Sequence, residues 1–186
     1  MPRRMKMPLN CSVNADAVQT ARRRLLETLS ATRKQAMTNS NALIGIAGVH
    51  YVASELSRRG MVALPTTRNT AAYDIVVVTP EGDRHANVQV KASSKRVTFF
   101  PMPPVDKIRA GPRDFYVLVR WLDDKKQFEG FLLTGREAKN AVRESITWQQ
   151  ENIRKGTRKV LFPSIDVYSN SPELARWKKA WDTWSL

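Results

Sequence analysis

Apolar residues recur with a helical period in the N-terminal part of the chain. Between residues 15 and 37 they fall three or four positions apart, at Val18, Ala21, Leu25 and Leu29. This spacing places them on one face of a helix, and Asn14 is suited to cap its N-terminus. The pattern therefore predicts a helix over residues 15–37, preceded by a flexible tail.

A second helical pattern follows and is predicted to end at Gly60, a residue type common just beyond the last turn of a helix. Asn39, Ser40 or Asn41 can start this helix. We therefore expect two separate helices in this part of the chain. The apolar face of the second comprises Leu43, Ile46, Val49 or Ala53, and Leu56.

Beyond Gly60 the apolar runs become short and rich in β-branched and aromatic residues, which predicts strands. The segments "TPEGD" and "DDKKQ" favour turns, so each is expected to join two strands as a hairpin. The proline-rich stretch 99–114 is expected to cross irregularly between them. The predicted strands cover residues 62–64, 73–78, 86–92, 115–122, 128–134 and 159–162.

Two further helices are predicted near the C-terminus. Thr134 and Glu137 have the spacing of a capping box and would start a short helix ending about Val142, before a polar and basic region. Ser171 and Pro172 would cap and start the last helix. Its three tryptophans favour attachment to the core over stacking on nucleobases, because they recur at helical spacing; they are Trp177, Trp181 and Trp184.

The chain is strongly basic, with 31 Lys and Arg against 17 Asp and Glu and a formal net charge of +14. This balance favours a polyanionic partner, because basic groups attract phosphates and release their counterions. We therefore expect a nucleic-acid partner, with Arg22, Arg23 and Arg24 holding the phosphate backbone without reading sequence. A solvated basic helix face without a partner is the alternative that charge alone leaves open.

The residue inventory excludes several other classes of protein. One cysteine, Cys11, rules out a disulfide framework and a Cys-rich zinc site, and two histidines leave little room for a His-based metal cluster. No apolar run approaches the roughly 20 residues of a membrane span, and the N-terminus lacks the apolar segment of a secretory signal. We expect a soluble cytoplasmic protein with no membrane partner; an organellar transit peptide is the alternative reading of the Arg-rich start.

Polar residues occupy one face of a strand that is otherwise rich in valine. Side chains alternate along "VQVKAS", so Val88 and Val90 enter the core while Gln89 and Lys91 emerge together on the other side. If the preceding hairpin pairs about the "EG" dipeptide of its turn, Asp74 lies opposite Gln89. The hairpin would thus bring a carboxylate, an amide and a lysine to one place.

This combination of groups suits the binding of magnesium and phosphate. Oxygen ligands for the ion would come from the Asp74 carboxylate, the Gln89 amide and the Val90 carbonyl. Lys91 would place a positive charge beside a phosphate. In the alternative reading, Asp74 bonds local backbone amides, while Gln89 and Lys91 face solvent.

The ordered segments "GIAGVHYVASELSRRG", "RNTAAYDIVVV" and "VQVKAS" resemble the PD-(D/E)XK nuclease superfamily, in particular its Holliday-junction-resolvase-like and Mrr-like members and small uncharacterised bacterial relatives. The resemblance covers roughly residues 42–142. It implies an α/β fold with a restriction-endonuclease-like core, in which helices flank a central mixed β-sheet. This domain would span residues 41–186, including the C-terminal tryptophan-bearing helix, after a basic arm and helix over residues 1–40.

The resemblance also implies roles for individual residues. Asp74 matches the superfamily's metal-binding Asp and Lys91 its catalytic lysine. Gln89 replaces an acidic metal ligand, a replacement that some Mrr-like nucleases share. Resolvase-like members also carry a glutamate on the first helix of the core, and Val49 occupies that position here.

These matches lead us to expect a DNA endonuclease with a degenerate site that uses Mg²⁺ or Mn²⁺. The alternatives are an inactive nuclease-fold protein that binds nucleic acid, and an interaction protein that docks through its C-terminal helix. A homodimer is expected, because nucleases that cut both strands often pair two sites. Besides the three helix arginines, the residues expected to bind nucleic acid are Arg68, Lys95 and Arg96.

Overall fold

The computed structural model describes residues 15–67, 73–94, 99–167 and 171–186. The backbone divides into two compact units, Met1–Ser40 and Asn41–Leu186. The described part of the first unit is helical, and the second unit contains both sheets. All elements that position the candidate site belong to the second unit.

Helix α1 is continuous from Ala15 to Arg58, so the prediction of two helices was wrong. Residues 15–44 contain no glycine or proline. Cap-forming residues such as Asn39 cost an uninterrupted helix less than about 1 kcal/mol each, which does not suffice to break it. The C-terminal end agrees better with the prediction, since Gly60 follows the last turn with a positive φ of 83°.

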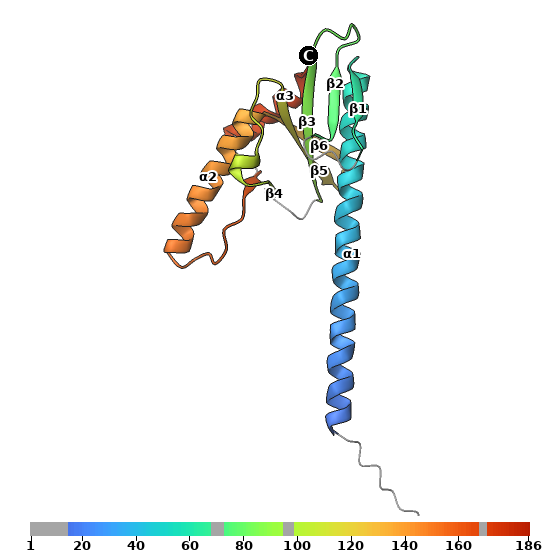
Figure 1. The fold of residues 1–186 in the computed structure, drawn as a ribbon, viewed down its shortest axis with the longest axis vertical. Helices are drawn as coiled ribbons and strands as arrows, with labels where there is room; N and C mark the ends of the chain where they lie inside the picture. Colours follow the sequence, from blue (N-terminus) through green and yellow to red (C-terminus); the bar gives the residue numbers. More distant parts are fainter. Residues whose placement is uncertain (1–14, 68–72, 95–98, 168–170) are drawn as a thin grey trace, which may run out of the picture. The chain divides into compact units, whose positions relative to one another are not determined.

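A mixed sheet of five strands forms the centre of the second unit, in the order β1-β2-β3-β5-β6 (Figure 1). All neighbouring strands are antiparallel except β3 and β5, which are parallel. The strands are β1 (Val62–Pro65), β2 (Ile75–Val78), β3 (His85–Ser93), β5 (Asp114–Leu122) and β6 (Gln127–Thr134). Five of the six predicted strands are thereby confirmed within a few residues.

A separate two-stranded sheet pairs β4 (Phe99–Pro101) with β7 (Ser164–Asp166). The strand predicted at residues 159–162 was therefore wrong. The Gln149 side chain explains the difference, because it bonds both backbone groups of Phe162, accepting its N–H at 2.7 Å and donating to its carbonyl at 2.8 Å. These backbone groups are thus satisfied by a helix residue and not by a neighbouring strand.

Helix α2 (Gly135–Arg154) begins at the predicted capping box. The Thr134 side chain accepts the Glu137 N–H, and the Glu137 carboxylate accepts the Thr134 N–H. The helix continues well beyond the predicted end at Val142, because nothing in the polar stretch that follows breaks it. It ends before Gly156, which has a positive φ of 72°.

Helix α3 (Pro172–Thr183) starts at the predicted Ser171 cap and packs against β6 at the edge of the five-stranded sheet. Its Trp181 belongs to the apolar core on one face of the sheet, and Trp177 belongs to the core on the other face. The expected attachment of this helix through tryptophans is confirmed. By covering β6, α3 also shields an edge that could otherwise pair with another chain.

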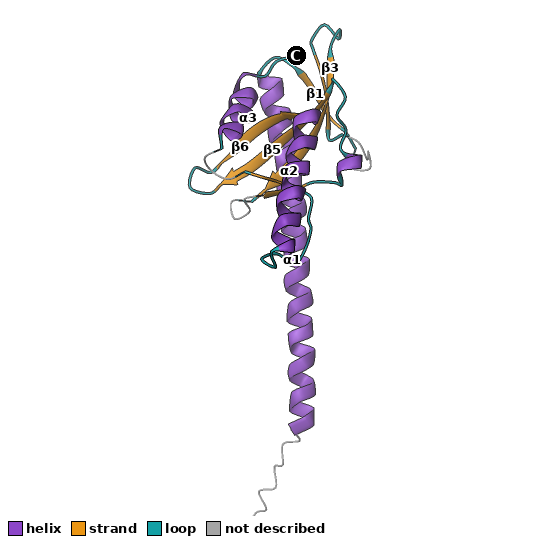
Figure 2. Ribbon diagram, turned by 90° about the vertical axis from the view of Figure 1, so that its left-hand side faces the viewer, coloured by secondary structure: helices purple, strands orange, loops and turns teal. Residues whose placement is uncertain are grey.

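Helices flank both faces of the sheet (Figures 1 and 2). The C-terminal part of α1, through Val52 and Leu56, packs on the face that carries Val88 and Val90. Helix α2 packs on the opposite face, together with the β4–β7 sheet. The predicted α/β class, with a mixed sheet flanked by helices, is thus confirmed.

Gly48 sets the distance between α1 and the sheet. A Cβ atom there would lie 2.6 Å from the Cβ of Ala92 and 2.9 Å from a methyl group of Val119. Gly48→Ala is expected to lower the free energy of unfolding by about 1–2 kcal/mol, because overpacking outweighs the better helix propensity of alanine. Gly45→Ala is the matched control, since no atom lies within 4 Å of its added Cβ.

Urea unfolding of both variants measures this difference. Gly45→Ala should raise the free energy of unfolding by up to about 1 kcal/mol, as expected for a glycine in the interior of a helix. Equal stabilisation by both substitutions would contradict the close packing of α1 at Gly48.

Candidate functional site

The hairpin between β2 and β3 has the register that the turn predicted. Ile75 pairs with Val88, which places Asp74 and Gln89 at the next position of the ladder. Strand β2 begins at Ile75, so the end of β3 from Gln89 onward extends past it. The Asp74 N–H still donates to the Val88 carbonyl at 2.9 Å and fixes Asp74 at this end of the ladder.

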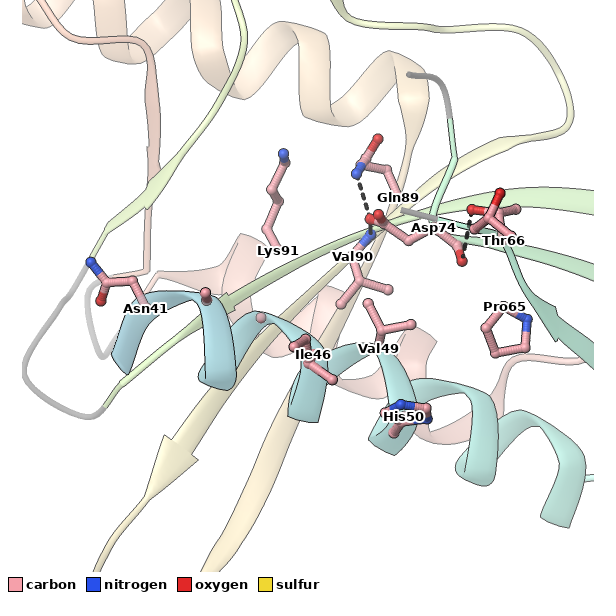
Figure 3. A pocket seen from close by; sticks show the side chains of 13 residues that line it. Asn41, Ile46, Val49, His50, Pro65, Thr66, Asp74, Gln89, Val90 and Lys91 are labelled. Atoms are coloured by element: carbon pink, nitrogen blue, oxygen red, sulfur yellow. Dashed lines mark hydrogen bonds between the residues drawn. The ribbon is translucent and has the colours of Figure 1, made fainter. Parts of the chain in front are cut away.

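The Asp74 carboxylate continues the ladder with its side chain (Figure 3). Its Oδ2 accepts the Val90 N–H at 2.7 Å, as a backbone carbonyl of a longer β2 strand would. The same oxygen accepts a hydrogen bond from the Gln89 side-chain amide. Asp74 therefore does bond a backbone amide, although on the neighbouring strand and not in its own loop.

Lys91 extends from β3 to the same side as Gln89 (Figure 3). Among the described residues it has no ion-pair partner within 4 Å. Burial lowers the pKa of its ammonium group, and the Asp74 carboxylate opposes this shift only in part. A poorly solvated ammonium without a close partner interacts strongly with an anion that enters the site.

These residues share a cavity of about 470 Å³. Strand β3 and Asp74 form one side, the end of β1 forms another, and the turns of α1 that follow Ser40 form the third. The cavity thus lies wholly within the second unit. Its lining residues are Asn41, Ala42, Gly45, Ile46, Val49, His50, Pro65, Thr66, Thr67, Asp74, Gln89, Val90 and Lys91.

Val49 and His50 come to this cavity from α1. Val49 is half-buried and points from the helix toward Val90 (Figure 3), so the helix position singled out by the resemblance lies at the same cavity as Asp74. Its side chain is apolar and supplies no ligand. The His50 ring lies on the exposed side of the helix, away from Asp74 (Figure 3).

The oxygen atoms at this site suit a hard cation that receives its other ligands from the substrate. Magnesium is commonly bound by one or two carboxylates together with substrate phosphates and water. Asp74 supplies one carboxylate, and no described hydrogen bond reaches its Oδ1. The N–H and the carbonyl of one residue point to the same side of a strand. Because the Val90 N–H points toward Asp74, the Val90 carbonyl also points to the side of β3 where β2 has ended.

The Gln89 side-chain amide is not oriented as a metal ligand would be. Its nitrogen, and not its oxygen, faces the Asp74 carboxylate. A half-turn of the carboxamide would present the oxygen instead. The residues therefore fit a magnesium ion that binds together with a phosphate, whereas no group of three or more His, Cys, Asp or Glu side chains is placed to hold a metal within the described ranges.

The residues predicted to bind nucleic acid fall into two sets. Arg22, Arg23 and Arg24 are exposed on α1, in the first unit, and Arg23 pairs with Glu27 at 3.1 Å. The others, at positions 68, 95 and 96, lie outside the described residues. Arg22, Arg23 and Arg24 thus belong to the first unit, whereas the cavity belongs to the second.

Arg109 is a residue near the site that the sequence did not reveal. It donates a hydrogen bond to the Tyr73 hydroxyl at 2.5 Å, and its guanidinium lies 4.9 Å from the centre of the Tyr73 ring. Tyr73 directly precedes Asp74, so this exposed arginine lies beside the end of the ladder. Only its position in the proline-rich loop could have suggested a role, because the contact spans 36 residues of sequence.

None of the helices in the described part of the chain is long and apolar enough to cross a membrane. Two exposed arginines of the loop that precedes β5, Arg109 and Arg113, contact the side chains of Tyr73 and His85. No protein-family model, curated protein or solved structure matches the chain.

Proposed function

We propose that the chain is a magnesium-dependent nuclease of the PD-(D/E)XK type that hydrolyses DNA phosphodiester bonds at the cavity around Asp74. One observation carries the proposal: Asp74, Gln89 and Lys91 line a single cavity at the end of one hairpin. A carboxylate can hold the metal ion and a poorly solvated lysine can stabilise charge on the phosphate, which are two tasks that this chemistry requires. The finer fold type, a restriction-endonuclease-like core, is part of the same proposal.

Each residue has a defined role in this proposal. Asp74 and the Val90 carbonyl would hold the ion, with phosphate oxygens of the substrate completing its ligands. Bound there, Mg²⁺ would polarise the phosphodiester and lower the pKa of a coordinated water. Lys91 would stabilise the negative charge that develops on the phosphate during attack. Gln89 would turn its amide oxygen toward the ion or keep Asp74 in place.

DNA is the proposed substrate because the chain is strongly basic and a basic surface attracts the phosphate backbone. The formal net charge is +14, and Arg22, Arg23 and Arg24 of the first unit are exposed. Arg109, beside Tyr73, would contact a phosphate next to the scissile one. Such contacts hold the backbone and carry no sequence information.

One observation favours a second function, binding of nucleic acid without cleavage. Val49 lies at the cavity where a second carboxylate would strengthen ion binding. In addition, the Gln89 amide and the Val90 N–H already satisfy one Asp74 oxygen without an ion. A protein with this site could retain the fold and the positive charge after losing hydrolysis.

Nicking of supercoiled plasmid distinguishes these functions. The natural protein should nick the plasmid at high Mg²⁺ or in Mn²⁺, and EDTA should abolish the reaction. Val49→Glu should raise the rate at low Mg²⁺ about tenfold, because a second carboxylate offsets the dehydration of the ion. Val49→Gln is the matched control of similar size without charge, and it should leave the rate unchanged.

The outcomes separate the two candidates. An inert natural protein together with an active Val49→Glu variant would favour binding without cleavage. If neither protein cuts although both bind DNA, the proposed hydrolysis is refuted.

A further inference from the structure

Three exposed aromatic side chains gather around helix α2 and the segment that leads from it to β7. Trp148, Phe162 and Phe99 are 55 %, 40 % and 39 % exposed, and none of them belongs to either apolar core. The rings of Phe99 and Phe162 are in contact, with their centres 6.0 Å apart. Gln149, which follows Trp148 in α2, bonds the backbone of Phe162. We call these three residues the aromatic patch.

The segment that carries Phe162 turns back along α2 and stays outside both sheets (Figure 1). The ladder between β4 and β7 ends with a bond from the Met102 N–H to the Pro163 carbonyl at 3.0 Å. The two residues after Met102 are prolines, which have no N–H with which to extend the ladder. Residues 158–163 therefore form neither helix nor strand, and Val160 is 65 % exposed.

Positive charge lies beside the aromatic patch. Four basic residues fall within residues 154–159, which we call the basic run, and none of them forms an ion pair with a described carboxylate. The Arg158 guanidinium lies 6.0 Å from the centre of the Trp148 ring. Glu151 is the one acidic residue in the sequence from 145 to 165, so this charge is largely uncompensated there. The basic run contains Arg154, Lys155, Arg158 and Lys159.

The combination of rings and cations indicates the chemistry of a partner. A contiguous exposed apolar patch marks an interaction site, and the neighbouring cations require that its partner be anionic. A second copy of this chain would bring two basic runs together, which repel each other. Single-stranded DNA has both features that the surface needs, because its unpaired bases stack on aromatic rings while its phosphates attract Lys and Arg. Duplex DNA keeps the faces of its bases stacked on one another.

We propose that single-stranded DNA docks on the aromatic patch, with its bases on Trp148 and Phe162 and its phosphates along the basic run. Arg158 contacts the phosphate next to the base that stacks on Trp148, since its guanidinium lies beside this ring. The inference deepens the proposed function by naming the form of the substrate, DNA with an unpaired segment. It rests on that function in taking DNA as the partner.

Equilibrium binding of the full chain to oligothymidylate of about 20 nucleotides, and to a duplex of equal length, tests the proposal. Fluorescence anisotropy at one fixed salt concentration, with EDTA present, measures both affinities without cleavage. Trp148→Ala should weaken binding of oligothymidylate about tenfold, as expected for the loss of one stacked base, and should change duplex binding less than twofold. Trp148→Phe is the matched control, because it keeps a ring and should retain most of the affinity.

Two results would overturn the proposal. Equal affinity of the natural protein and Trp148→Ala for oligothymidylate would show that no base stacks on this ring. Polyglutamate that binds as tightly as oligothymidylate, with the same dependence on Trp148, would assign the surface to an acidic protein instead. A chain that is inert in plasmid nicking but binds oligothymidylate through Trp148 would refute only the hydrolysis. An active nuclease in which Trp148→Ala binds like the natural protein would refute only the docking surface.

Discussion

Trp181→Ala is expected to lower the free energy of unfolding by about 3–5 kcal/mol, the usual cost of removing a large aromatic side chain from a core. Trp181 is 2 % exposed. Its indole lies flat against Gly130 of β6, where an added Cβ would approach the indole nitrogen to 2.5 Å. The Arg59 guanidinium covers the ring at 4.5 Å from its centre. The cavity left behind cannot close readily, because strand backbone forms one wall.

Urea unfolding followed by far-UV circular dichroism measures this loss. Trp148→Ala is the matched control, since this tryptophan is 55 % exposed and its removal should cost less than about 1 kcal/mol. Equal losses for the two variants would show that α3 does not contribute to the core through Trp181.

Lys91→Ala is expected to reduce the rate of plasmid nicking by about 10²–10³-fold, the effect typical of removing one group that stabilises transition-state charge. The ammonium group is poorly solvated and has no close described partner, so its charge is available to a phosphate. Lys91 would contact only the phosphate in the cavity and none of the other phosphates of bound DNA. Its loss should therefore lower the affinity for DNA only a few-fold. Single-turnover cleavage and equilibrium binding to the same DNA separate the two effects.

Lys139→Ala provides the control for the loss of one positive charge. Lys139 is half-buried on α2 and does not line the cavity around Asp74. Its substitution should change nicking less than twofold. If Lys91→Ala and Lys139→Ala cut equally well, Lys91 has no part in catalysis and the proposed site is wrong.

The part of the candidate site that depends on one hairpin could be predicted from the sequence. Turn chemistry determined the register, because Gly82 takes a positive φ of 77° and its N–H closes the turn onto the Thr79 carbonyl at 3.0 Å. Alternation along β3 then placed Gln89 and Lys91 on one face. Local rules sufficed since all these contacts lie within about 20 residues of sequence.

Other features depend on contacts that no local pattern encodes. The position of β7 depends in part on the bonds of Gln149 to Phe162, which a strand-like sequence at 159–162 conceals. The pairing of Arg109 with Tyr73 brings together a loop and a strand end. The continuity of α1 is different, because helix propensity accounts for it once the cap-forming residues near Asn39 are given their small cost.

The packing of α3 across both faces of the sheet has a consequence for the order in which the chain can fold. All five strands of the main sheet precede residue 135, whereas Trp177 and Trp181, which complete the two cores, come much later. During synthesis the sheet is therefore made before its last apolar cover exists. Exposed apolar surface of this kind favours aggregation. We expect that the nascent chain reaches its protected state only after α3 has left the ribosome.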